Sequence, residues 1–153
     1  MKLVRLWASV LSAIFVGSVF AALLLWLTAF AQHGITEALS ELSAHIMSVG
    51  AIDNIYRGIP AGILIAAIVW MIPMSRGFSF FTVLTFTYFI SIGGFSHVVV
   101  GSCEAAYDVL VGNSSVADYF FKFLIPTGLG NILGGTGVFT LLVSAQVKAE
   151  KNS

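Results

Sequence analysis

One histidine lies in a run of the chain that is poorly suited to a regular helix. His97 follows the residues Gly93, Gly94, Phe95 and Ser96, and three valines and another glycine come after it. A glycine pair interrupts a helix because glycine loses more backbone entropy than any other residue and brings no side chain to packing. A histidine can hydrogen-bond to an anion or give it a proton. The chemistry expected of this run is therefore the binding or protonation of a small anion.

The remaining polar residues of the apolar regions suggest less chemistry. Asn131 lies in a glycine-rich run, and we interpret it as a residue that bonds across helices, with the loosened backbone beside His97 as one candidate partner. Glu104 and Asp108 share a helical face; they either line an outer vestibule or are solvated loop-end charges, and we expect the latter. No nucleophile with a base, paired carboxylates or cluster of metal ligands is evident. We therefore expect neither an enzyme nor a cofactor.

The composition decides the class of protein that must position these residues. The chain has 153 residues, of which 58% are hydrophobic and 9% are charged, and its net charge is zero. A typical soluble domain is about 25% charged. An ordinary soluble globule and a disordered tail are excluded, and so is a nucleic-acid binder, which needs a basic surface. The sequence predicts an integral membrane protein with the lipid bilayer as its surroundings.

Four apolar stretches meet the length of about 20 residues that a helix needs to cross the hydrocarbon core. We expect a single all-α membrane domain over residues 1–153. Its spans are about 6–30, 55–74, 78–111 and 120–147, and the third is a broken helix interrupted near 93–101. The first stretch also fits a signal peptide, but signal h-regions have only about 7–15 residues, which favours a retained span.

The interruption falls about halfway along the third span. We expect a half-helix up to Ile92, an irregular crossing, and a second half-helix that resumes at Ser102. Irregular backbone at that depth must face protein or a watery cavity, because lipid cannot satisfy its polar groups. An ionisable side chain there is costly and is by default a candidate for function. His97 is therefore the centre of the predicted pore.

The loops predict the orientation of the chain. Basic residues precede the first span, separate the second and third spans at Arg76, and follow the fourth span, whereas the other two loops are mainly acidic. The positive-inside rule then places both termini of this multi-pass protein in the cytoplasm. Apolar residues recur at helical spacing over about 35–50, which predicts an amphipathic connector on the outer membrane surface.

Two runs of the chain together resemble the formate/nitrite transporter family. Gly94-Phe95-Ser96-His97, followed by residues 98–102, is similar to that family's broken fifth helix, which has a central His after a Gly-Phe pair. Residues 126–135 read Pro-Thr-Gly-Leu-Gly-Asn-Ile-Leu-Gly-Gly and resemble the sixth helix with its Gly-Asn-x-x-Gly-Gly signature. The stretch that begins at Arg57 resembles the fourth helix. The run around His97 is more similar to the uncharacterised branch of the family than to its best-known formate channels.

The resemblance implies an aquaporin-like architecture of six spans in two inverted repeats, of which this chain lacks the first two spans. It also implies pentamers with one pore in each protomer, a location in the cell inner (plasma) membrane, and small monovalent anions such as formate, nitrite and hydrosulfide as substrates. The pore residues that it implies are Gly93, Gly94, Phe95, Ser96, His97 and Asn131. Gly62 stands where the formate channels usually carry a polar Asn.

Two functions remain open on this basis. The intact late motifs and His97 favour transport of small monovalent anions through a pore with a central histidine, and coupling of that transport to protons is an open option. The missing spans favour the alternative, a truncated and non-transporting membrane remnant or an assembly subunit. A membrane enzyme and a channel for water or neutral solutes have less support in the residues.

Overall fold

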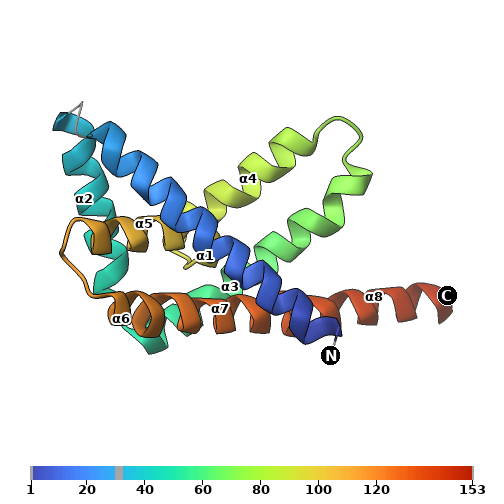
Figure 1. Ribbon diagram of the computed structural model, residues 1–153. Helices are drawn as coiled ribbons and strands as arrows, with labels where there is room; N and C mark the ends of the chain where they lie inside the picture. The colour runs from blue at the N-terminus through green and yellow to red at the C-terminus, as the bar shows by residue number, and fades with distance from the viewer. Residues whose placement is uncertain (1, 30–32, 153) are drawn as a thin grey trace. The chain divides into compact units, whose positions relative to one another are not determined.

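The computed structural model describes residues 2–29 and 33–152, and the regular elements in this part of the chain are all helical, without a strand (Figure 1). The elements in chain order are α1 (Lys2–Ala29), α2 (His33–Ser48), α3 (Ala51–Met71), the 3-10 turn η1 (Ile72–Met74), α4 (Ser79–Ile92), α5 (Val98–Leu110), α6 (Val116–Asp118), the π-helical η2 (Tyr119–Leu124), α7 (Ile125–Ile132), the π-helical η3 (Leu133–Phe139) and α8 (Thr140–Asn152). The all-α class expected from the sequence is confirmed for the described residues.

Three helical stretches of the described residues are long and apolar enough to cross a membrane. They are Arg5–Thr28, Ala51–Met74 and Val116–Lys151. The last has 36 residues, about 54 Å of helix, which exceeds the hydrocarbon thickness of about 30 Å. The apolar α4 has 14 residues, or about 21 Å, and is too short to cross alone. Large apolar side chains such as Phe20 and Leu141 are exposed, as lipid-facing residues would be.

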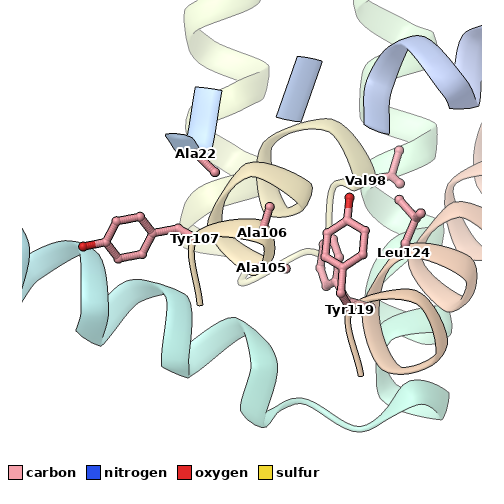
Figure 2. Close-up of a cluster of buried hydrophobic side chains, with 8 residues drawn as sticks. Ala22, Val98, Ala105, Ala106, Tyr107, Tyr119 and Leu124 are labelled. Carbon is pink, nitrogen blue, oxygen red and sulfur yellow. The ribbon is translucent and has the colours of Figure 1, made fainter. Parts of the chain in front are cut away.

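The helices form two compact units, which are described separately. The first consists mainly of α1, α2, α5, α6 and η2. Its core is a cluster of small and aromatic side chains, most of which come from α5 and η2 (Figure 2). The buried members are Ala22, Val98, Ala105, Ala106, Tyr107, Tyr119, Phe123 and Leu124. Small residues on α5 let the rings of η2 approach its backbone closely.

The start of α5 differs from the expected helix boundary. The sequence predicts that the second half-helix resumes at Ser102, whereas α5 already begins at Val98. Val98 is buried in the core of the first unit, and the ring of Phe123 lies where a side chain at Gly101 would be. Tertiary packing therefore holds this β-branched, glycine-containing turn in helical form, against its weak intrinsic preference.

The expectation that Asp108 is a solvated charge is wrong. Asp108 is 1% exposed, and its side chain connects α5 to α2 and to the turn after α5 through hydrogen bonds. Its carboxylate accepts hydrogen bonds from Ser43 of α2 at 3.4 Å, from the amide of Asn113 at 3.2 Å, and from the hydroxyl of Ser114. A buried carboxylate needs such donors, because an unpaired one would shift its ionisation instead. Asp108 thus attaches α2 and the turn after α5 to α5 itself.

The second unit consists mainly of α3, α4, α7, η3 and α8. Figure 1 shows α3 and α4 as the two arms of a hairpin joined by the turn that contains Ser75 and Gly77. Glycines bring α3 against α7 and η3. A Cβ added at Gly130 would collide with the carbonyl oxygen of Ile55, and one at Gly134 with that of Ile59. These two glycines therefore serve close helix packing.

This packing predicts different effects for two glycines of the same segment. We expect Gly134→Ala to lower the free energy of unfolding by about 1–3 kcal/mol, because the methyl group must push α3 away. Gly137→Ala serves as the control, since nothing lies within 4 Å of a Cβ at that position. The measurement is unfolding of the purified chain in detergent, followed by tryptophan fluorescence. Equal stability of both variants would contradict the close approach of α3 at Gly134.

Candidate functional site

The candidate site is the segment between α4 and α5, residues 93–97, which we call the His97 loop. It begins with a well-defined helix stop. The amide of Phe95 donates to the carbonyl of Ile90 at 3.0 Å, and the amide of Gly94 donates to the carbonyl of Ser91 at 3.1 Å. These two bonds, with Gly94 in the left-handed region at φ +59°, form a Schellman motif. Gly94 is therefore required to end α4 at this point.

Gly93 has a separate role in the loop. A Cβ at Gly93 would collide with the ring of Phe95, which folds back over the end of α4. The backbone of Gly93 itself is right-handed, with φ −70°, so any residue could adopt it. The first glycine of the pair thus makes room for an aromatic ring, and the second allows the backbone conformation.

Ser96, the residue before His97, is bonded through all of its polar groups. Its amide donates to the carbonyl of Arg57 at 3.2 Å, and its hydroxyl donates to Oδ1 of Asn54 at 2.7 Å. Its carbonyl accepts a hydrogen bond from Nδ2 of Asn131 at 2.9 Å. We call these three contacts the Ser96 clamp. They hold the His97 loop against α3 and α7, both of which belong to the same unit.

Asn131 connects the loop to α3 as well as to α7. Its Nδ2 also donates to the carbonyl of Gly58 at 2.9 Å. A Cβ at Gly58 would lie 3.1 Å from that nitrogen, so the absent side chain leaves space for the amide. One turn later, a Cβ at Gly62 would collide with the backbone oxygen of Asn131. The polar Asn that formate channels usually carry at this position has no room in this packing.

The structure brings together most of the residues that the sequence singled out. The segment Gly93–His97 forms one loop, and Asn131 contacts it directly at Ser96. His97 is half-buried and lies directly before the first residue of α5. Among the described residues there is no group of three or more His, Cys, Asp or Glu that could hold a metal ion.

Sequence reasoning missed Asn54. Its side chain is 1% exposed, yet it accepts the hydroxyl of Ser96. The available signal was its spacing, because Asn54 precedes Gly58 by four residues and Gly62 by eight. Residues four apart lie on one face of a helix. An amide on the same face as two packing glycines must itself be buried at that contact and needs a polar partner.

The site can hold the backbone around His97 in one arrangement. The helix stop fixes where the loop leaves α4, and the Ser96 clamp fixes the peptide that precedes His97. The amides of residues 93–96 and the carbonyl of Ser96 thus have partners within the protein, as non-helical backbone inside a membrane protein requires. Such an arrangement holds the half-buried His97 at the end of a fixed peptide.

These features define an α-helical membrane protein with an interrupted apolar region around a histidine. Residues 1–145 match the family model described as formate/nitrite transporter, and the chain belongs to this family. It is 30% identical over 151 residues to the inner membrane protein YfdC of Escherichia coli (strain K12). The aligned region covers 99% of this chain and 49% of the relative. The chain thus spans about half the length of that relative. No solved structure matches the chain.

The two hydrogen bonds that the side-chain amide of Asn131 donates predict a large loss of stability when this residue is replaced. We expect Asn131→Ala to destabilise the chain by about 2 kcal/mol, because two partly buried carbonyl oxygens lose their donor. Asn131→Asp should destabilise it at least as much, since a carboxylate would face both carbonyls. The measurement is unfolding in detergent at neutral pH, with the exposed amide variant Gln146→Ala as control. An Asp variant as stable as the native chain would contradict these contacts.

A double-mutant cycle tests the contact between Asn54 and Ser96. We expect Asn54→Ala and Ser96→Ala to be coupled by about 1 kcal/mol, as is usual for a single hydrogen bond between side chains. The control cycle pairs Asn54→Ala with Thr87→Ala, because the Thr87 hydroxyl bonds only to carbonyls within α4. Additive effects in both cycles would show that Asn54 does not hold Ser96.

Proposed function

We propose that this chain forms part of a passage for small monovalent anions of the formate/nitrite type, with His97 at its centre. Family membership supports the class of substrate. The observation that carries the role of His97 is the Ser96 clamp, which fixes the peptide directly before it. These three hydrogen bonds stabilise the fold and also hold the backbone before His97 in one arrangement, which a histidine that binds an anion requires.

In the proposed mechanism the anion approaches the first turn of α5, whose amides carry a partial positive charge. His97 hydrogen-bonds to the anion there. When the imidazole is protonated, it passes a proton to the anion, and the neutral acid then moves on through apolar surroundings. The imidazole regains a proton from water on the side of entry. Each turnover of this cycle would move one proton with one anion, which couples transport to pH.

The proposal includes a topology. We propose one membrane domain with four crossings, of which the third consists of α4 and α5 as two half-helices on either side of the His97 loop. They have 14 and 13 residues, about 20 Å each. Both termini would face the cytoplasm of a cell with this protein in its inner membrane, and five copies would assemble, as the family resemblance implies. Arg76, in the turn after η1, would lie on the cytoplasmic side.

Replacement of His97 tests this function. We expect His97→Phe to abolish formate flux in proteoliposomes, or to remove its dependence on pH, because phenylalanine can neither bond to an anion nor protonate it. His45→Phe is the matched control, since His45 lies exposed on α2. Flux is followed with a pH-sensitive dye inside the vesicles, over a series of external pH values.

Two outcomes would contradict the proposal. Unchanged flux of the His97→Phe variant at every pH would exclude the proposed role of the histidine. No flux with the native chain at any pH would instead support a non-transporting membrane subunit.

A further inference from the structure

Two buried hydroxyl groups in the first unit play no part in the site described above. Ser102 of α5 is fully buried and Tyr119 of η2 is 3% exposed. The two side chains lie next to each other. Yet neither hydroxyl has a hydrogen-bond partner of acceptable geometry in the described part of the chain. Buried hydroxyls without partners are rare, because each costs about 1–3 kcal/mol in lost hydration.

The hydroxyl of Tyr119 is directed toward the beginning of α5, and the position of Ser102 in the helix suits the same direction. Figure 2 shows the hydroxyl of Tyr119 pointing to the end of α5 where Val98 lies. Ser102 is the fifth residue of α5, and side chains of a helix lean toward its N-terminus. A helical serine commonly bonds to the carbonyl four residues earlier, which here is Val98, but Ser102 does not. Its hydroxyl therefore remains available as a donor.

The surroundings of the two hydroxyls exclude bulk water. The ring of Phe123 occupies the space beside Gly101, and Phe123 is itself 1% exposed. Apolar walls strengthen any hydrogen bond made between them. The acidic Glu104 follows Ser102 by two residues, about 200° around the helix, and so lies on another face. The pair thus offers two donors near the positive end of a helix dipole.

We propose that Ser102 and Tyr119 form a second binding station for a small carboxylate-type anion such as formate. Each hydroxyl donates to one of the two oxygens of the anion, and the dipole of α5 supplies the favourable charge. The station rests on the proposed transport function for its ligand, but it uses none of the residues of the His97 loop. It would hold the anion beside α5 as it enters or leaves.

Equilibrium binding tests the station without any need for flux. The purified full chain in lipid nanodiscs is unfolded by heat at increasing potassium formate, with potassium gluconate keeping the ionic strength constant. A ligand that binds the folded state raises the unfolding midpoint. We expect formate to raise the midpoint of the native chain. Ser102→Ala and Tyr119→Phe should each weaken the apparent affinity about tenfold, as loss of one hydrogen bond to a charged group implies.

Tyr107→Phe is the matched control. Tyr107 is also buried in the core of the first unit, but its hydroxyl points away from Tyr119 (Figure 2). This variant should bind formate as the native chain does. If Tyr119→Phe does not fold, Ser102→Ala still tests the station. This substitution removes only one oxygen atom from α5, so we expect the variant to fold.

Three results would overturn the station. The first is a midpoint of the native chain that does not respond to formate. The second is an equal response in all variants. The third is a rise in the basal midpoint of Ser102→Ala and Tyr119→Phe with an unchanged formate response, which would indicate a bound water or a void between the hydroxyls. Failure of the transport proposal would appear separately, as absent flux with formate binding retained.

Discussion

The arrangement around His97 depends on Ser96 more than on any other residue. A non-helical peptide in an apolar setting is tolerated only when its amide and carbonyl groups find partners within the protein. Ser96 satisfies this requirement with its amide on α3, its carbonyl on Asn131 and its hydroxyl on Asn54. The polar groups of Ser96 therefore have partners within the protein, and His97 follows a residue that is held by three hydrogen bonds.

The glycines of α3, α7 and η3 support the Ser96 clamp as well as close helix packing. A side chain at Gly58 would crowd the side-chain amide of Asn131, which bonds to the Gly58 carbonyl, so glycine leaves room for Asn131 to reach the loop. The close approach at Gly130 and Gly134 sets the distance between the helix backbones at which one amide can bond to α3 and to Ser96 together. A larger residue at any of these positions would move the donor away from both carbonyls.

The sequence predicted the helical class and the helix end at Ile92, because each follows from composition or local backbone preference. It did not predict the start of α5 at Val98, the burial of Asp108, or Asn54. These three depend on neighbours far along the chain. Phe123 stabilises the first turn of α5, Ser43 supplies a donor to Asp108 from 65 residues earlier in the chain, and Ser96 lies 42 residues after Asn54. Local periodicity contains no information about such partners.

At position 62 this chain has a glycine that allows close helix packing, where formate channels usually carry a polar side chain. A side-chain amide there, as in formate channels, requires α3 to stand away from α7, whereas glycine lets the backbone of Asn131 touch the helix. In this chain the buried amide of α3 is instead Asn54, two turns earlier, and it bonds to the loop rather than facing a passage. In the proposed pore, α3 would therefore act by holding the His97 loop in place. Direct polar contact with the anion at this loop would be left to His97.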